Sequence, residues 1–190
     1  MIDKIIFTVT PIYSIPPRGA AAVETWMYQV AQRTKFPNRI VCIKNEGYSD
    51  YSYVNERCSI HRIGFSSVYK RIFQKWTRLD PLPYSKRILK VAEKFEITDQ
   101  SVIVVHNSMK LYRQIRSQAP QAKVVIHMHN AFEPKLLDKK VKMIVPSLFL
   151  KNYYQSYLPE ADIVIVPNGI DLDIYQSSYE SISKNKLNIP

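Results

Sequence analysis

Seven short runs rich in valine and isoleucine recur along this chain, and they constrain its fold more than any other feature. Most are near-continuous in apolar residues, as strands buried on both faces of a sheet should be. The runs cover residues 4–10, 39–44, 59–64, 101–106, 123–129, 141–145 and 162–166. Helical patterns lie between them, and alternating strands and helices require right-handed crossovers. The sequence therefore predicts an α/β fold with a doubly wound, mostly parallel sheet of the Rossmann-like kind.

Two helices are indicated by particular residues. One apolar helical face, with i, i+3, i+4, i+7 and i+8 spacing, is formed by Val23, Trp26, Met27, Val30 and Ala31. A second helix is predicted over residues 148–157, after the N-cap residue Ser147. A length of 190 residues with 46% hydrophobic content suits one domain. We expect that domain to span residues 1–175, and the polar stretch 176–190 to be a linker toward a second domain.

Charge and hydropathy limit the classes of binding partner that this chain can have. The formal net charge is +11, so acidic partners such as nucleic acid, anionic lipid or a phosphorylated glycan are favoured. No nucleic-acid-binding fingerprint is present, and no apolar run approaches the roughly twenty residues that span a bilayer. We expect a cytoplasmic protein whose membrane contact is peripheral. Cys42 and Cys58 show neither metal-ligand spacing nor a disulfide framework, so they are predicted to be buried free thiols.

Ligands of an open parallel sheet bind at the carboxyl ends of its strands, so residues that follow strands are the first candidates for a site. Gly19 lies in the loop between the first strand and the first helix, where a missing Cβ allows a turn or the close approach of a ligand. The amino end of that helix suits a phosphate or a carboxylate. The alternative is an ordinary loop glycine, with Glu24 complementing the helix dipole.

The second candidate place is the segment His127-Met-His129-Asn130, at the end of an apolar strand. Side chains two residues apart in a strand point to the same face, so both imidazoles could meet one ligand or one metal ion. A metal ion would need a further ligand, for which Glu133 is the nearest candidate. A histidine bonded to a backbone carbonyl is the alternative.

The third and fourth places are His106-Asn107-Ser108 and Pro146-Ser147, which also follow apolar strands. His106 could contact a ligand, or it could have a purely structural role. Asn107 and Ser108 could line a cleft, or they could turn the chain and cap the next helix. Capping is the stronger interpretation for Ser108 and Ser147.

A basic stretch, residues 68–94, carries a large share of the positive charge. Its first half is predicted to be a basic amphipathic helix, with Lys70, Arg71, Lys75 and Arg78 beside aromatic residues. These four side chains could contact anionic lipid headgroups or glycolipid phosphates. The alternative is an ordinary helix with a solvated basic side.

Residues 165–175, Ile-Val-Pro-Asn-Gly-Ile-Asp-Leu-Asp-Ile-Tyr, resemble the signature that closes the N-terminal domain of family 4 GT-B glycosyltransferases. Residues 16–24 resemble the G-G-A-E loop of this family, with Arg18 replacing its first glycine and one extra alanine. Residues 106–107 and 146–149 are similar to its V-H-V-H-N and S-x-F motifs. The resemblance implies that His129 contacts the transferred sugar as the catalytic residue. It also implies that donor or acceptor is bound by Arg18, Gly19, Glu24, His106, Asn107, His127, Asn130, Ser147, Asn168 and Gly169.

Longer strings, residues 6–11, 15–28, 73–84 and 127–134, are similar to those of enterobacterial lipopolysaccharide core α1,2-N-acetylglucosaminyltransferases. This resemblance implies transfer of N-acetylglucosamine from UDP-GlcNAc to a glucose of the outer core, with retention of configuration, at the inner membrane. It implies neither a metal ion nor another cofactor. The nucleotide pocket would lie in a second domain, so this 190-residue chain alone should be inactive.

Other classes are distinguished by particular residues. A dinucleotide-binding module needs a glycine-rich loop after the first strand and an acidic residue after the second, whereas Gly19 is alone and Lys44-Asn45 follows the second strand. A transferase of the same family that uses UDP-glucose or UDP-galactose remains an alternative. A non-catalytic glycolipid-binding domain is another.

Overall fold

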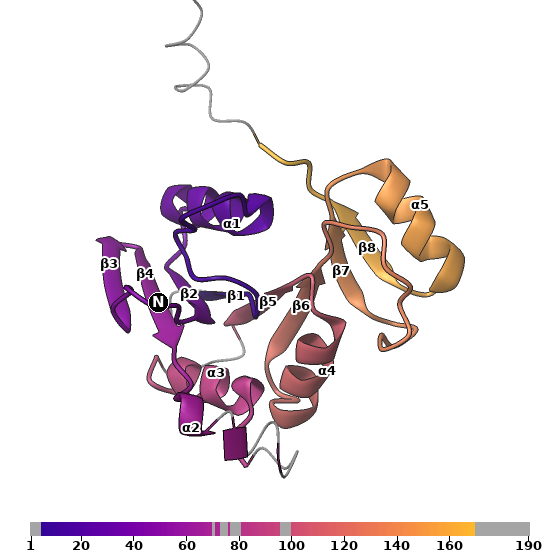
Figure 1. Ribbon diagram of the computed structural model, residues 1–190. Helices are drawn as coiled ribbons and strands as arrows, with labels where there is room; N and C mark the ends of the chain where they lie inside the picture. Colours follow the sequence, from indigo (N-terminus) through magenta and orange to yellow (C-terminus); the bar gives the residue numbers. More distant parts are fainter. Residues whose placement is uncertain (1–4, 70, 73–75, 77–80, 96–99, 170–190) are drawn as a thin grey trace, which may run out of the picture.

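The computed structural model describes residues 5–69, 71–72, 76, 81–95 and 100–169, and within them eight strands form one sheet (Figure 1). The strand order is β3-β4-β2-β1-β5-β6-β7-β8. The strands are β1 (Ile6–Val9), β2 (Asn38–Ile43), β3 (Tyr51–Asn55), β4 (Cys58–Ile63), β5 (Val102–His106), β6 (Lys123–His127), β7 (Lys142–Val145) and β8 (Asp162–Ile165). All neighbours are parallel except β3 and β4. The predicted fold class and all seven predicted strands are confirmed.

Strand β3, at the edge of the sheet, is an addition to the predicted set. It pairs antiparallel with β4 after a turn in which the side-chain oxygen of Asn55 accepts hydrogen bonds from the backbone N–H groups of Arg57 and Cys58. Its two tyrosines, Tyr51 and Tyr53, are 51% and 65% exposed. An edge strand open to solvent lacks the continuous apolar run of a buried strand, which is why the sequence pattern missed it.

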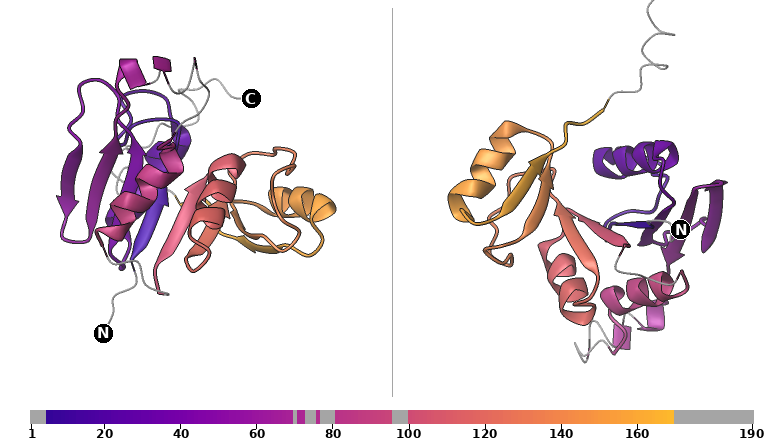
Figure 2. Two further views of the ribbon diagram at one scale, coloured as in Figure 1. Left: turned by 90° about the horizontal axis from the view of Figure 1, so that it is seen from below. Right: turned by 180° about the vertical axis from the view of Figure 1, so that it is seen from behind.

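Helices cover both faces of the sheet (Figures 1 and 2). They are α1 (Ala22–Arg33), α2 (Ser67–Tyr69), α3 (Tyr84–Glu93), α4 (Met109–Gln118) and α5 (Leu148–Tyr157). Helix α1 lies on one face, and α3 and α4 lie on the other. The hydroxyls of Ser108 and Ser147 accept hydrogen bonds from the N–H groups of Leu111 and Leu150. Both predicted N-caps are thereby confirmed.

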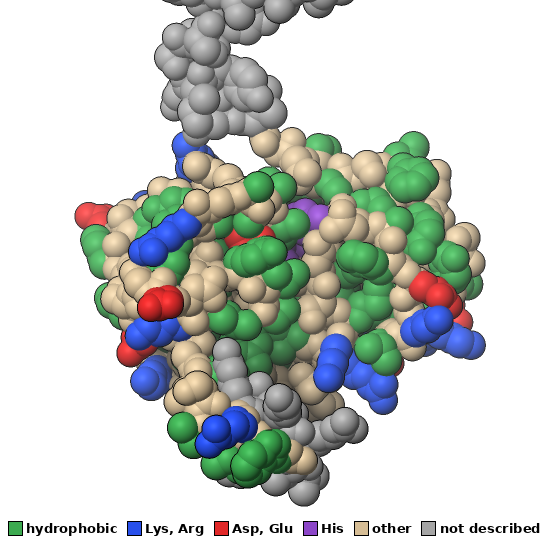
Figure 3. All heavy atoms as spheres, in the orientation of Figure 1, with side chains coloured by type: hydrophobic (Ala, Val, Ile, Leu, Met, Phe, Trp, Pro, Cys, Tyr) green, Lys and Arg blue, Asp and Glu red, His purple; other side chains and the backbone are tan. Residues whose placement is uncertain are grey.

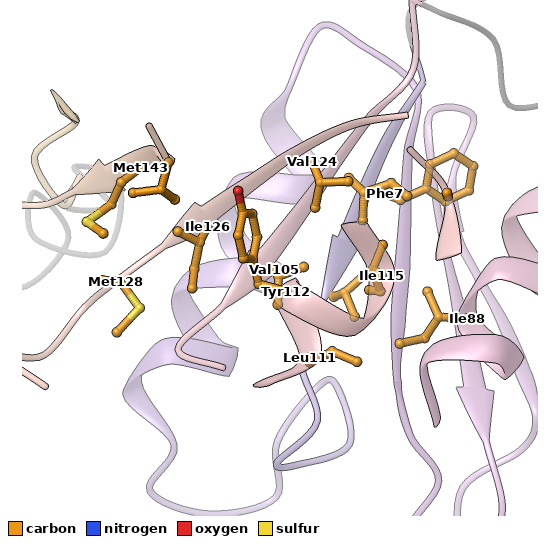
Figure 4. Close-up of a cluster of buried hydrophobic side chains, with 14 of the residues drawn as sticks. Phe7, Ile88, Val105, Leu111, Tyr112, Ile115, Val124, Ile126, Met128 and Met143 are labelled. Carbon is orange, nitrogen blue, oxygen red and sulfur yellow. The ribbon is translucent and has the colours of Figure 1, made fainter. Parts of the chain in front are cut away.

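The core is divided by the sheet into two clusters, and strand β2 shows why. Ile40 and Cys42 pack beneath α1 with Met27, whereas Val41 points to the opposite face. The larger cluster includes residues of α3, α4 and the central strands (Figure 4). Alternation along a strand that is apolar on both faces produces this two-layer packing. Cys42 and Cys58 are free and buried, as predicted.

Strand β1 marks the topological switch point of the sheet. The chain leaves β1 through α1 toward β2 on one side, and it returns later to β5 on the other. The connections that leave β1 and β5 therefore run in opposite directions along the sheet. In a sheet of this kind a crevice opens between the carboxyl ends of two such strands. Thr10 follows β1 and His106 ends β5.

The loop between β1 and α1 is fixed by Arg62, a buried residue of β4. Its guanidinium donates two hydrogen bonds to the carbonyl of Ile15, at 3.0 and 2.6 Å. It donates two more, to the carbonyl of Ser49 and the hydroxyl of Ser52. These hydrogen bonds tie the loop to β4 and to the segment at the start of β3.

Candidate active site

Three histidines converge at the carboxyl edge of the sheet. His106 ends β5, His127 ends β6, and His129 lies two residues further on. The Nδ1 atom of His106 lies 3.0 Å from the Nε2 atom of His129, at hydrogen-bonding distance. The rings of His127 and His129 stack with their centroids 4.0 Å apart. The prediction that His127 and His129 could meet one ligand is compatible with this stack, and His106 joins them from the neighbouring strand.

All three imidazoles are neutral at neutral pH because protonation would place charge in a poorly hydrated cluster. Burial holds the pKa of His106 well below its usual range, and the neighbouring His127 and His129 lower it further. Burial, followed by the charge of His129, lowers the pKa of His127 to about 3. Burial lowers the pKa of His129 to about 4. Each ring therefore offers both a donor and an acceptor nitrogen.

The turn after β5 positions the histidines. Asn107 adopts the left-handed backbone region, with φ of 49°, and its side-chain oxygen accepts a hydrogen bond from the backbone N–H of His129. Its own backbone N–H donates to the carbonyl of His127. The structure thus shows the turn-forming role of Asn107, and its contact with a ligand stays a prediction.

Trp26, on the inner side of α1, contacts the whole cluster. Its ring centroid lies 5.8, 4.9 and 5.4 Å from those of His106, His127 and His129. Sequence reasoning assigned Trp26 only to an apolar helical face. Helical spacing does not distinguish a tryptophan that packs on aliphatic core residues from one that packs on imidazoles. This contact could be predicted only with knowledge of the strand order.

Glu24 lies in the first turn of α1, where it is only 3% exposed. Its Oε1 atom accepts a hydrogen bond from the hydroxyl of Thr10 at 2.9 Å. The carbonyl of Thr10 in turn accepts a hydrogen bond from the hydroxyl of Tyr84 of α3. The loop after β1 is therefore connected to both helical layers. Thr10 and Tyr84 were not among the predicted site residues.

An apolar cleft of about 940 Å³ runs along α1. Its lining includes Gly19, the start of α1, Trp26 and Gly169, so it brings together two predicted binding glycines. Ala21 occupies the N-cap position and supplies no side-chain hydrogen bond, so the first N–H groups of α1 lack such a cap. A Cβ at Gly19 would meet nothing within 4 Å, and Gly19 has no left-handed φ. Within this chain, neither a turn nor close packing requires the glycine.

Arg18 points toward a smaller, neighbouring cavity of about 270 Å³. Its guanidinium donates a hydrogen bond to the carbonyl of Gly47 and lies 4.4 Å from the centroid of the Tyr48 ring. Residues Asn45 and Glu46 complete the polar side of this cavity. Gly19 lines both spaces, so the loop 18–21 separates the cleft from the Arg18 cavity.

The other predicted site residues surround the same edge without joining the histidine cluster. Asn130 is exposed, and its carbonyl accepts a hydrogen bond from the hydroxyl of Tyr154. Ser147 caps α5. Asn168 is exposed, two residues after Val166. Glu133, the carboxylate considered as a third metal ligand, is exposed and pairs with Lys135 at 2.9 Å, and His106 takes its place beside the two histidines.

The basic stretch is described in part. Arg71 is exposed, and its guanidinium lies 5.5 Å from the ring centroid of Trp76, which is 69% exposed. Lys70, Lys75 and Arg78 lie outside the described residues. No helix in the described part of the chain is long and apolar enough to cross a membrane.

Solved structures share this architecture. The N-terminal domain of Candida albicans trehalose-6-phosphate phosphatase matches with a TM-score of 0.59 and 12% identity, over 96% of this chain and 52% of that one. An α,α-trehalose-phosphate synthase (UDP-forming) from Burkholderia vietnamiensis matches with a TM-score of 0.53 and 10% identity, over 95% and 53%. The E. coli trehalose-6-phosphate protein bound with UDP-2-fluoro glucose matches with 0.55 and 11%, over 95% and 53%. The fold is that of a GT-B N-terminal domain.

The chain is also a homologue of the lipopolysaccharide 1,2-N-acetylglucosaminetransferase of Salmonella typhimurium. The two are 62% identical over 189 residues, which cover 100% of this chain and 50% of that transferase. This chain thus spans about half the length of the curated relative it matches. No protein-family model matches it. The resemblance stated from the sequence is confirmed at the level of the fold and of this relative.

Proposed function

We propose that this chain is the acceptor-side half of a retaining family 4 GT-B glycosyltransferase. The whole protein would move N-acetylglucosamine from UDP-GlcNAc to a glucose of the lipopolysaccharide outer core. The observation that carries the proposal is the 62% identity, along the whole chain, to a lipopolysaccharide 1,2-N-acetylglucosaminetransferase. Two features support a site for polar sugar groups: the cluster of three histidines at the ends of β5 and β6, and the cleft along α1, which shares Trp26 with that cluster.

Sugar transfer creates a particular electrostatic demand. When the nucleotide diphosphate leaves, negative charge develops on the leaving oxygen and positive character on the sugar carbon. The N–H groups at the start of α1, beside Gly19, would face the phosphate side of the cleft. A second domain, joined through residues 176–190, would hold the nucleotide, while residues 1–175 bind the acceptor.

His129 is the residue proposed to contact the transferred sugar. It is less buried than His106 and His127. Its Nε2 atom faces His106, so Nδ1 is the nitrogen available to a sugar hydroxyl. A neutral imidazole can donate or accept in that contact without adding a charge to the site. His127 is the competing candidate, since its Nε2 atom is buried without a hydrogen-bond partner.

The donor is tested on the whole protein that contains this chain. Purified enzyme would be incubated with an outer-core acceptor and equal concentrations of UDP-GlcNAc, UDP-glucose or UDP-galactose, and product would be identified by mass spectrometry. We expect transfer from UDP-GlcNAc, with an α-linked product by NMR. Faster transfer from another donor would replace the proposed substrate. Acceptor binding without transfer from any donor would support the non-catalytic alternative.

The histidine assignment is tested by comparing two variants of the whole enzyme. His129→Ala should lower kcat by about tenfold or more, which corresponds to about 1.4 kcal/mol of transition-state stabilisation. His127→Ala should have the smaller effect on kcat relative to its effect on thermal stability. The opposite order would assign the sugar contact to His127. Normal turnover in a stably folded His129→Ala enzyme would remove His129 from the site.

The basic stretch is proposed to hold the enzyme at the cytoplasmic face of the inner membrane. An exposed tryptophan beside an arginine, as in the Trp76 and Arg71 pair, suits the headgroup region of a bilayer. The inner core of lipopolysaccharide and the surrounding lipids would supply the negative charge. Each basic residue near such a surface is worth about 1 kcal/mol of attraction.

Vesicle sedimentation tests this contact. Neutralising Lys70, Arg71, Lys75 and Arg78 to Gln should weaken binding to phosphatidylglycerol vesicles and leave phosphatidylcholine vesicles unaffected. A control with the same loss of net charge replaces four exposed lysines elsewhere, namely Lys123, Lys139, Lys140 and Lys142. Equal weakening in both variants would mean that net charge alone attracts the membrane. Unchanged binding of the first variant at low salt would show that the basic side is merely solvated.

A further inference from the structure

The three clustered histidines offer more than hydrogen bonds to a sugar. One ligand nitrogen from each of His106, His127 and His129 can be chosen so that all three lie within 4.8 Å of one another. Two of the nitrogens come from adjacent strand ends, and the third comes from His129, two residues beyond the end of β6. The backbone N–H of His129 donates a hydrogen bond to the side-chain oxygen of Asn107, which holds this segment beside the end of β5. They therefore form a preassembled set of donors on rigid elements.

The spacing is close to that of a transition-metal site. Zinc binds imidazole nitrogen at about 2.0–2.1 Å in tetrahedral geometry, so two nitrogens on one ion lie about 3.3 Å apart. His106 Nδ1 and His129 Nε2 are already 3.0 Å apart. Small side-chain rotations, on the order of 1 Å at the nitrogens, would bring the third donor to the same distance.

His127 supplies an independent observation. Its side chain is 1% exposed, and its Nε2 atom has no hydrogen-bond partner. A buried polar atom without a partner is unfavourable and calls for a ligand, a water or an ion.

We propose that His106, His127 and His129 form a binding site for Zn²⁺ or a similar first-row divalent cation. Three imidazoles with an open fourth position are a known donor set for zinc, and imidazole suits zinc, copper, nickel and iron rather than magnesium or calcium. The site goes beyond the proposed sugar transfer and does not depend on it, because metal binding requires neither donor nor acceptor.

The surroundings leave room for a fourth ligand. A cavity of about 150 Å³ borders His106, His127 and Trp26, which is space enough for a water molecule on the ion. Histidine surface is visible from outside in the space-filling view (Figure 3), and His129 is only partly buried. The Trp26 ring covers the imidazoles from the α1 side.

Zinc titration of the 190-residue chain, free of any polyhistidine tag and treated with a chelator, tests the site. Calorimetry should give one Zn²⁺ per chain with a Kd of about 1 µM or lower. Co²⁺ should produce visible absorption bands of a low-symmetry nitrogen site, and Mg²⁺ should not bind. His127→Ala and His129→Ala should each weaken zinc binding by about tenfold or more.

The chain supplies its own matched control. It has four histidines, and the fourth, His61, lies outside the cluster and packs between Tyr51 and Phe95. His61→Ala should leave zinc binding unchanged. Circular dichroism melts would establish that each variant is folded, and His129→Ala, at the least buried of the three positions, decides the result if His127→Ala unfolds. Absence of binding below about 100 µM zinc, or equal affinity in wild type and a folded His129→Ala chain, would overturn the proposal.

Discussion

The side-chain oxygen of Asn107 accepts a hydrogen bond of 2.8 Å from the backbone N–H of His129. This bond joins the turn after β5 to the segment after β6, and the backbone N–H of Asn107 reinforces it by donating to the carbonyl of His127 at 3.0 Å. Asn107 adopts φ of 49°, a conformation that asparagine tolerates better than most side chains. Position 107 thus requires both a residue that tolerates a left-handed backbone and a side chain that accepts a hydrogen bond.

Two substitutions separate these requirements. Asn107→Ala removes the hydrogen-bond acceptor, and alanine adopts the left-handed backbone conformation less readily than asparagine. We therefore expect this substitution to lower the free energy of unfolding by about 1–3 kcal/mol. Asn107→Gly removes only the acceptor and should cost less. Urea unfolding at pH 7.5 measures both. If the glycine variant were the less stable of the two, backbone conformation would not be the constraint at this position.

Arg62 provides a second test, because its guanidinium holds the loop that carries Arg18 and Gly19. It is 6% exposed, and it donates hydrogen bonds to two carbonyls and the hydroxyl of Ser52 rather than to a carboxylate. Arg62→Met should lower the free energy of unfolding by about 2–4 kcal/mol, since several charge-assisted hydrogen bonds are lost. Arg57→Met, at an exposed position near the β3–β4 turn, is the control and should change stability by less than about 0.5 kcal/mol. Equal effects would show that Arg62 is not an anchor.

The two thiols give a third prediction. Cys42 and Cys58 are both 0% exposed, and burial raises the pKa of each to about 11. Native protein at pH 8 should therefore react with a disulfide reagent at least about a hundredfold more slowly than protein in concentrated urea. Two thiols per chain should react after unfolding. Rapid labelling of the native chain, abolished in Cys58→Ser, would show that β4 opens locally.

The sheet could be predicted from the sequence because its strands are buried on both faces. Such strands appear as continuous valine and isoleucine runs, and all seven runs of this kind became strands. Strand β3 lacks the run because its tyrosines face solvent at an edge. The caps at Ser108 and Ser147 were equally accessible, since an N-cap depends on a residue and its own helix.

The candidate site could be predicted only in part. Position after a strand identified His106, and the two-residue spacing grouped His127 with His129, but the sequence did not place His106 with these two. That His106 and His129 touch depends on β5 and β6 being neighbours, which is a matter of strand order. Trp26 and Thr10 were not predicted as site residues for a similar reason. Their contacts join different elements of the fold, and spacing within one element does not show which elements pack together.

The last prediction concerns pH and the fourth histidine, His61. Burial lowers its pKa to about 4, and the positive charges of Arg39 and Lys94 contribute. In the unfolded chain its pKa should be near 6.5. Between these two values the unfolded state binds more protons than the folded state, so the free energy of unfolding must fall as pH is lowered. The contribution is at most about 1.4 kcal/mol per pH unit, and it is absent above about pH 7.

His61→Gln removes this linkage. Relative to wild type, the variant should gain stability as pH falls from 7.5 to 5, measured by urea unfolding in the presence of a chelator. Differences between the two proteins cancel the titration of the carboxylates and of the clustered histidines. Arg39→Gln should raise the pKa of His61 by removing one nearby charge. An NMR titration follows the His61 ring directly, and a midpoint near 6.5 in the folded protein would contradict the prediction.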